Sequence, residues 1–247
     1  MQKDKRTQAL GFLQTDTLFY VDMLECISRG RAEIVYAECE NPSLNGVLLY
    51  DKPSGIYMLA ATKTLGACTA LSCLQTKEVA QKSGWLVTHG DGAREAVYSK
   101  LHVVWETPVW QVAYLDTPPF AIKDGLRFGL AKREEIELIK KTYDKESPEN
   151  IERLAKSGKI HCAFCGDEFV GYIGEHPEGS MGMLHVFPEY RRKGYAEALE
   201  SLLANKYIEQ GRIPYGHVVV GNDASMALQK KLGFQVADEK IYWLKEG

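Results

Sequence analysis

The sequence of 247 residues predicts an α+β fold arranged as two domains of about 120 residues each. Two observations lead to this prediction. Segments with strand character and segments with helical periodicity are mixed along the whole chain, and their order in the first half recurs in the second. The composition, with 45% hydrophobic and 26% charged residues, is that of ordinary globular proteins, so each half can bury a core.

The second half, residues 126–247, shows the pattern most clearly. Ser147 and Pro148 are typical of a helix start, and Gly233 after two lysines is typical of a helix end. Strands are predicted at residues 126–130, 160–165, 169–174, 181–187 and 215–220, with a last strand pair around 234–244. Helices are predicted at residues 134–143, 147–157, 192–209 and 222–232.

The first half has a fainter version of the same order. Strands are predicted at residues 32–39, 46–50, 56–61, 85–88 and 103–114. Helices are predicted at residues 7–13, 17–27, 67–81 and 92–101. Pro118 and Pro119 interrupt regular structure between the halves. We therefore expect a linker at residues 116–125, a first domain at 1–117 and a second at 126–247.

Parts of the two halves can be aligned with each other. Residues 90–101 align with residues 221–232, glycine on glycine and leucine on leucine. With a small change of offset, residues 63–68 align with residues 191–196. Chance similarity between two amphipathic helices explains part of the match, but the shared order of elements favours a duplication. In that case the first copy has lost two of three cations and its anion site.

The loop at residues 188–196 carries the strongest functional signal. It follows a predicted strand, contains Arg191, Arg192 and Lys193 before Gly194, and leads into a predicted helix. Backbone N–H groups at a helix N-terminus, a glycine that permits close approach and three cations together predict a site for a diphosphate. A solvated basic turn is the alternative interpretation. The matching strand and helix favour the anion site.

Composition excludes several other classes. A net charge of −3 and a pI near 6.1 give no general nucleic-acid footprint, and we expect no nucleic-acid partner. The polar start of the chain lacks the apolar core of a signal peptide, and no apolar run reaches about 18 residues. We expect a cytoplasmic protein without a membrane partner, as a monomer or homodimer.

Cys162 and Cys165 have metal-site spacing but no second such pair accompanies them, so we expect free thiols and no metal.

Three motifs occur in order within residues 126–247: Val186-x-Pro188-x-x-Arg191-x-x-Gly194-x-Ala196, Asn222-x-x-Ser225-x-x-Leu228 and Lys231-Leu232-Gly233-Phe234. Together they resemble the GNAT superfamily of acyl-CoA-dependent N-acyltransferases. Two further segments are similar to its two-domain glycine N-acyltransferase-like branch: Pro188-Glu189-Tyr190-Arg191 and Pro214-Tyr215-Gly216-His217-Val218. The resemblance implies tandem GNAT-like domains, each a mixed, mostly antiparallel twisted sheet flanked by helices, with the first domain degenerate.

The resemblance also implies a co-substrate, acetyl-CoA or another acyl-CoA. The strand before the 188–196 loop would splay from its neighbour and pair with the pantetheine arm, and the loop amides would bind the pyrophosphate. The implied cofactor-binding residues are Leu184, Val186, Arg191, Arg192, Lys193, Gly194, Tyr195, Ala196, Asn222 and Ser225. From the sequence alone, Asn222 is first a helix N-cap, and one residue can fill both roles.

The implied reaction is direct attack by the amine of a small molecule or amino acid on the acyl thioester in a ternary complex, with acetyl as the expected acyl group. A base must take a proton from the amine, and a backbone N–H such as that of Val186 must stabilise the oxyanion. The resemblance implies a glutamate near the start of the fourth strand, where this sequence has Ser180. The candidate bases are therefore Glu178, His185 and His217.

Many members of the superfamily use as general acid a tyrosine seven residues after the position of Asn222. This chain has Gln229 there, and an amide is not a proton donor in that sense. Two functions therefore remain open: an active N-acyltransferase, or a non-catalytic module that binds or senses acyl-CoA. The intact 188–196 loop and the nearby bases favour the enzyme. A nucleic-acid-binding protein would need a far wider basic face.

Overall fold

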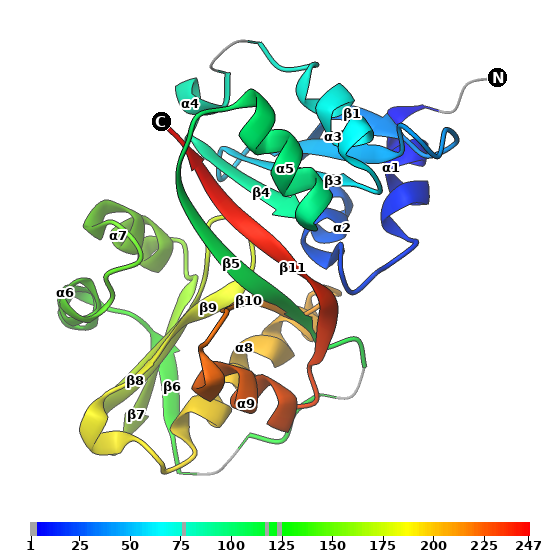
Figure 1. The fold of residues 1–247 in the computed structure, drawn as a ribbon. Coiled ribbons are helices and arrows are strands. Elements are labelled where there is room, and N and C mark those ends of the chain that lie inside the picture. The colour runs from blue at the N-terminus through cyan, green and yellow to red at the C-terminus, as the bar shows by residue number, and fades with distance from the viewer. Residues whose placement is uncertain (1–3, 76–77, 117–118, 123–124) are drawn as a thin grey trace. The chain divides into compact units, whose positions relative to one another are not determined.

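A computed structural model describes residues 4–75, 78–116, 119–122 and 125–247 (Figure 1). The chain forms two compact units. Unit 1 comprises the chain up to Ala113 together with His217–Asp223 and Gln235–Gly247, and unit 2 comprises Tyr114–Gly216 and Ala224–Phe234. The predicted α+β class is confirmed, with helices flanking a sheet that is mostly antiparallel. No helix in the described ranges is both long and apolar enough to cross a membrane.

Unit 1 is a sheet of six strands covered on both faces. Its strands, in spatial order, are β1 (Ala32–Glu38), β2 (Gly46–Asp51), β3 (Ile56–Ala61), β4 (Trp85–His89), β11 (Gln235–Glu246) and β5 (Val103–Ala113). All neighbours are antiparallel except β3 and β4. Its helices are α1 (Lys5–Leu13), α2 (Val21–Ser28), α3 (Thr64–Leu71), α4 (Glu78–Gln81) and α5 (Asp91–Lys100). Helices α1 and α2 pack against one face, and α3 and α5 against the other. Strands β2 and β3 are almost continuously apolar because they are buried on both faces.

Unit 2 contains β6 (Arg127–Leu130), β7 (Ile160–Cys165), β8 (Glu168–Glu175) and β9 (Met181–Val186) as an antiparallel sheet. The start of β10 (Tyr215–Val219) lies parallel to β9. The helices are α6 (Arg133–Thr142), α7 (Pro148–Lys156), α8 (Tyr195–Glu209) and α9 (Asp223–Lys231). Helices α6 and α7 share a core with β7 and β8, and α8 lies on the opposite side of these strands (Figure 1).

The order of elements repeats, as predicted. Strands β1 to β3, helix α3, β4, α5 and β5 occur in the same order as β7 to β9, α8, β10, α9 and β11. Each series has a parallel pair, β3 with β4 and β9 with β10, whose connection is helical: α3 and α4 in the first series and α8 in the second. The compact units nevertheless differ from the predicted sequence domains, because β11 pairs with β4 and β5 inside unit 1. The division into sequence domains 1–117 and 126–247 stays a prediction.

Four predicted elements were wrong in detail. The helix at residues 17–27 is α2, which begins at Val21. The helix at residues 67–81 is two helices, α3 and α4. The strand pair around residues 234–244 is the single strand β11, which has a partner on each edge. Helix α8 begins at Tyr195 rather than at residue 192, because Arg192 and Gly194 have positive φ angles of 59° and 84° that a helix does not accept. Part of the predicted linker, including Pro118, lies outside the described residues.

Candidate functional site

The loop before α8 presents backbone N–H groups. Strand β9 runs into a short 3₁₀ turn, η1 (Pro188–Tyr190), and Gly194 is the N-cap of α8 without a side-chain hydrogen bond to cap the helix. The first backbone bond of the helix runs from the N–H of Ala198 to the carbonyl of Gly194, at 3.1 Å. The N–H groups before it point beyond the helix end. Arg192 and Gly194 have left-handed conformations, and such turn conformations occur in loops whose backbone N–H groups bind anions.

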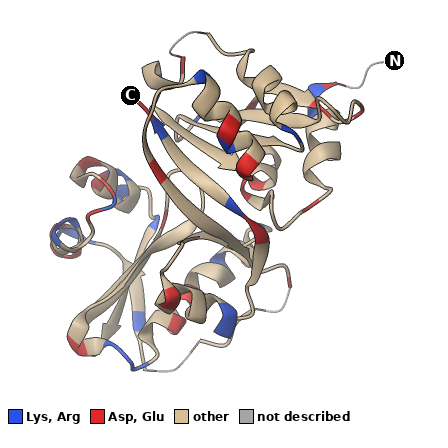
Figure 2. Cartoon of the chain, in the orientation of Figure 1, with Lys and Arg blue, Asp and Glu red and all other residues tan. Residues whose placement is uncertain are grey.

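The three cations of the loop lie in different environments. Basic residues follow one another in the segment that leads into α8 (Figure 2). Arg191 donates from Nε to the carbonyl of Val186 at 3.0 Å, and so fixes the loop to the end of β9. Lys193 places its Nζ 5.3 Å from the centre of the Tyr190 ring. The side chain of Arg192 is exposed. Arg191 thus has a structural role in addition to the one expected of it as a charge partner.

Strand β9 pairs fully on one edge only. With β8 its register includes Val186 opposite Gly171, whereas with β10 it pairs at Met181 opposite Gly216. A bulge at Met183, whose φ is 53°, separates this start from Leu184 and Val186. Such a partly paired strand edge can accept an extended ligand through backbone hydrogen bonds.

Asn222 and Ser225 mark the start of α9. Asn222 directly precedes the helix, at the position of an N-cap, and its N–H donates to the carbonyl of Val219 at 2.9 Å. Asn222 belongs to unit 1 and Ser225 to unit 2. Their roles toward a cofactor stay predictions.

Glu178 is buried, with 4% of its surface exposed, in the turn between β8 and β9. Its Oε1 accepts a hydrogen bond from the hydroxyl of Ser180. Burial raises the pKa of the Glu178 carboxyl, although the nearby His176 and the Ser180 hydroxyl act in the opposite direction. Ser180, which the sequence places where a glutamate was implied, therefore holds Glu178 at the start of β9.

His185 and His217 lie in different units and differ in their freedom to take a proton. The ring of His185 stacks on Tyr172 with 5.4 Å between the centroids, and burial together with Arg191 lowers its pKa. His217 belongs to unit 1, where Trp243 Nε1 donates to its Nδ1 at 3.1 Å. Its Nε2 lies 2.9 Å from Oε1 of Gln111, so both ring nitrogens are engaged. His217 thus lies in unit 1, whereas Glu178 and His185 lie in unit 2.

A further histidine, His176, lies next to Glu178 and was not among the candidates predicted from the sequence. His176 has its Nδ1 3.3 Å from Oε1 of Glu146, which directly precedes the N-cap of α7. Burial lowers the pKa of His176, but the hydrogen bond with Glu146 and the charge of Glu178 outweigh it and raise the pKa overall. The only signal in the sequence was a histidine two residues before a candidate base. Glu146 lies 30 residues away, and no local pattern connects them.

Glu175, at the end of β8, belongs to a separate ion network. It accepts from Arg212 and from Lys159, and Tyr207 donates to its Oε2 at 3.0 Å. Burial raises the pKa of Glu175, yet Arg212 and Lys159 outweigh burial and hold it below its usual value. The Glu175 carboxylate thus links β8 to α8 through Tyr207 and to the segment after α8 through Arg212.

Gln229, at the place of the implied tyrosine, is buried on α9. Its Nε2 donates to Oε1 of Glu200 on α8 at 3.0 Å. Burial raises the pKa of Glu200 to about 7, against which the hydrogen bond from Gln229 has the smaller effect.

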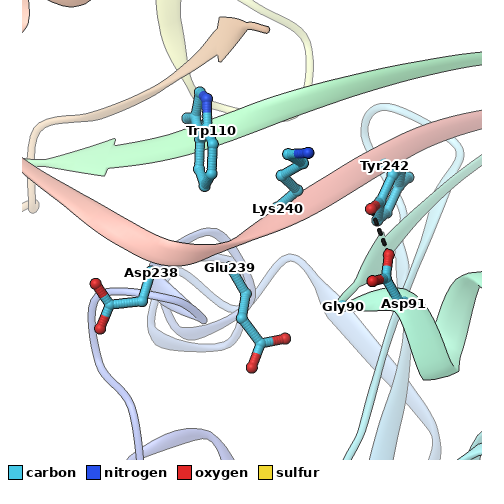
Figure 3. Close-up of a pocket in the computed structure, with 7 residues that line it drawn as sticks. All are labelled: Gly90, Asp91, Trp110, Asp238, Glu239, Lys240 and Tyr242. Atoms are coloured by element: carbon cyan, nitrogen blue, oxygen red, sulfur yellow. Dashed lines mark hydrogen bonds between the residues drawn. The ribbon is translucent and has the colours of Figure 1, made fainter.

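Two places in unit 1 align in sequence with the 188–196 loop and with the start of α9. Gly66 of α3 lies so close to the backbone that a Cβ there would stand 2.8 Å from the carbonyl oxygen of Asn45. A pocket of about 260 Å³ lies at the start of α5 (Figure 3). Its lining residues are Gly90, Asp91, Trp110, Asp238, Glu239, Lys240 and Tyr242. Three carboxylates against one ammonium repel a phosphate at this place, which is the counterpart of the start of α9. The loss of an anion site at residues 63–68 stays a prediction.

Comparison with known proteins identifies the fold. Residues 166–244 match the model of the FR47-like protein family, and no curated protein matches the chain significantly. A GCN5-related N-acetyltransferase from Kribbella flavida is 14% identical, with a TM-score of 0.54 over 93% of this chain and 95% of that one. A GCN5-related N-acetyltransferase from Sphaerobacter thermophilus is 14% identical, with a TM-score of 0.54 over 99% and 94%.

A third solved structure, an acetyltransferase of the GNAT family from Novosphingobium aromaticivorans, is 19% identical, with a TM-score of 0.52 over 81% of this chain and 88% of that one. At these identities the likeness is one of fold. The chain has the GNAT fold, and the likeness extends over both units.

Proposed function

We propose that the chain is an acyl-CoA-dependent N-acyltransferase whose cofactor site is in unit 2. It transfers an acyl group, with acetyl as the expected one, to the amine of a small molecule or amino acid by direct attack in a ternary complex. The observation that carries the proposal is the uncapped N-terminus of α8, which is preceded by Arg192 and Lys193 and follows a strand with a partly paired edge.

These residues fit a diphosphate carried on an extended arm. The amides of residues 192–196 bind the pyrophosphate, with Arg192 and Lys193 adding positive charge. Leu184 and Val186 offer backbone groups to the pantetheine arm, and Ser225 contributes from the first turn of α9 within unit 2. The bound acyl-CoA supplies a thioester carbonyl that an amine can attack.

The residues beside β9 suit an amine as the acceptor. Glu146 and Glu178 are acidic side chains close to His176, and the three come together where β9 begins. A partly buried group of carboxylates attracts a cationic ammonium, and a titratable side chain among them can take its proton.

Gln229 favours a second candidate, a module that binds acyl-CoA without turnover. Its amide is engaged with Glu200 and takes the place of the implied tyrosine acid. Without that tyrosine, the thiolate that leaves the thioester takes its proton from water, or the acyl transfer does not occur. We favour the enzyme because a thiol, with a reference pKa near 8.5, is an adequate leaving group without a dedicated acid.

A binding assay and a turnover assay test both candidates. Acetyl-CoA at 100 times its Kd stabilises a binding protein by about 2.7 kcal/mol, which raises the melting temperature by several degrees. Arg192→Ala with Lys193→Ala should remove most of this shift. The matched control is Lys132→Ala with Arg133→Ala, an exposed basic pair at the start of α6.

Free-thiol release with a panel of amines then separates the two functions. Release above the rate without amine supports the transferase, and a full thermal shift without release for any amine supports the sensor. An unchanged shift in the Arg192/Lys193 variant contradicts the phosphate site itself.

A further inference from the structure

His176 is fixed in place by the turn between β8 and β9. Its N–H donates to the carbonyl of Ser180 and its carbonyl accepts from the N–H of Gly179, both at 2.9 Å. The side chain is 23% exposed, so the imidazole can be reached from solvent while its backbone is held.

Glu146 orients the imidazole from the other side. Its Oε1 faces Nδ1 of His176, and its Oε2 accepts from the side-chain amide of Asn150 at 3.1 Å, in the first turn of α7. A carboxylate at Nδ1 holds the proton on that nitrogen and leaves the lone pair of the neutral ring on Nε2. Within the described residues, no protein group hydrogen-bonds to this Nε2.

Gly182 brings that nitrogen against β9. A Cβ at Gly182 would overlap with Nε2 of His176 and stand 2.6 Å from its Cδ2, so only glycine admits the ring here. Gly182 directly follows Met181, the residue at which β9 pairs with Gly216. The free nitrogen therefore lies where the partly paired edge of β9 begins, beside the groups that the proposed function assigns to the cofactor arm.

We propose that His176 is the general base of the acyl transfer and that Glu146 is its positioning residue, an inference that rests on the proposed function. An acceptor that arrives as an ammonium first releases one proton to solvent. The neutral amine then bonds through its nitrogen to the thioester carbonyl carbon and gives a second proton to Nε2 of His176. The carbon–sulfur bond breaks with its electron pair on sulfur, which takes a proton from solvent. His176 then returns its own extra proton to solvent, so that amide and free thiol are the net products.

His176 is better placed for this step than the bases expected from the sequence. The carboxyl of Glu178 is only 4% exposed and already accepts from Ser180. His185 stacks on Tyr172 and makes an edge-to-face contact with Phe187, with 5.2 Å between the centres of the two rings. Glu178 instead adds negative charge near His176, which stabilises the imidazolium formed when the proton arrives.

The pH dependence follows from the groups that face His176. They are Tyr143 at the end of α6, Glu146 before α7, and Glu175 and Glu178 on β8 and the turn after it. The carboxylates raise the pKa of His176 against the effect of burial. Because the base must be neutral, kcat/KM should rise with pH through this raised pKa.

The test measures kcat/KM against pH together with the acetyl-CoA thermal shift. His176→Gln should lower kcat/KM about 10²- to 10⁴-fold at high pH and remove the rising limb of the profile of kcat/KM against pH. The thermal shift with acetyl-CoA should not change. Glu146→Gln should move the limb to lower pH, because the group that stabilises the imidazolium is lost. Gly182→Ala should lower the rate as His176→Gln does, without removing any charge. His102→Gln, an exposed histidine of unit 1, is the matched control.

The outcomes distinguish a failure of this inference from a failure of the proposed function. If the unmodified chain gives a thermal shift but no thiol release, both are overturned. If it releases thiol and His176→Gln keeps the rate and the limb, only the base is overturned. If the rise of kcat/KM with pH disappears in Glu178→Gln but persists in His176→Gln, Glu178 rather than His176 is the general base. A merely structural role for Glu146 would lower the rate equally at every pH.

Discussion

The side chain of Gln229 donates to Glu200 across 3.0 Å and joins α9 to α8 through two buried groups. Burial raises the pKa of the Glu200 carboxyl to about 7, and the hydrogen bond from Gln229 has a smaller effect in the opposite direction. Its partner Gln229 also has a buried Oε1 that accepts no hydrogen bond from the described residues. The pair therefore makes the packing of α9 on α8 dependent on pH.

The first prediction is that Glu200→Gln stabilises the chain at alkaline pH. The folded pKa is raised from 4.5 to about 7, so stability is highest below the unfolded value and is lost as pH rises from there to about 7. The shift corresponds to about 3 kcal/mol. Urea unfolding at about pH 5 and about pH 8 should show this loss in the unmodified chain and not in the variant. Glu209→Gln, exposed on the same helix, should keep it.

The second prediction separates Arg191 from Arg192. Arg191→Ala removes the bond to the carbonyl of Val186 and should lower the free energy of unfolding by about 1 kcal/mol, as well as weakening acetyl-CoA binding. Arg192→Ala should weaken binding and leave unfolding unchanged, because its side chain is exposed. Calorimetric titration and melting without ligand measure the two effects. Equal melting temperatures for both variants would contradict the structural role of Arg191.

The third prediction concerns a buried pair of an aspartate and a histidine in unit 1. Asp22 is fully buried and its Oδ1 lies 2.9 Å from Nε2 of His89. Burial raises the pKa of Asp22, but His89 outweighs it and the pKa is lowered overall. The stability from Asp22 is thus present above its ordinary pKa and is lost as pH falls through the lowered one.

Asp22→Asn should cost about 3–5 kcal/mol of unfolding free energy, since it leaves one partner of a buried pair. Asp238→Asn, exposed in the same unit, should cost little. An Asp22→Asn variant as stable as this control would show that the pair contributes nothing.

The fourth prediction tests the pair of Glu175 and Arg212. Arg212→Met should destabilise the chain by about 3–5 kcal/mol, because Glu175 is then buried beside Tyr207 with Lys159 as its remaining cation. Adding Glu175→Gln to that variant should restore part of the loss. A double-mutant cycle from urea unfolding gives the coupling between the two side chains, and strict additivity would contradict it.

Local patterns predicted most elements well. Strand β3 has the bounds predicted from its apolar run, and the helix–stop pattern at Gly233 correctly placed the end of α9. The strand, loop and helix around residues 181–209 were also found, because each carries its own periodicity and the loop its own charge. Within this segment only the start of α8 was predicted too early, because the backbone conformation of the loop, rather than helix propensity, decides where that helix begins.

Contacts between distant segments could not be predicted. Lys63 is the N-cap of α3 whereas Gly194 is the N-cap of α8, so the alignment of Lys63 with Arg191 does not match equivalent positions of the two helices. The contact of His176 with Glu146 depends on how α7 packs beside the β8–β9 turn, which no short segment encodes.

The position of β11 has a consequence for the order of folding during synthesis. Strand β11 lies between β4 and β5 in unit 1, yet the ribosome makes it after every residue of unit 2. Until it emerges, β4 and β5 each lack a neighbour and expose an open edge to other nascent chains. Unit 1, whose synthesis begins first, therefore completes its sheet last. During synthesis the open edges of β4 and β5 must be kept from pairing with other chains until β11 is made.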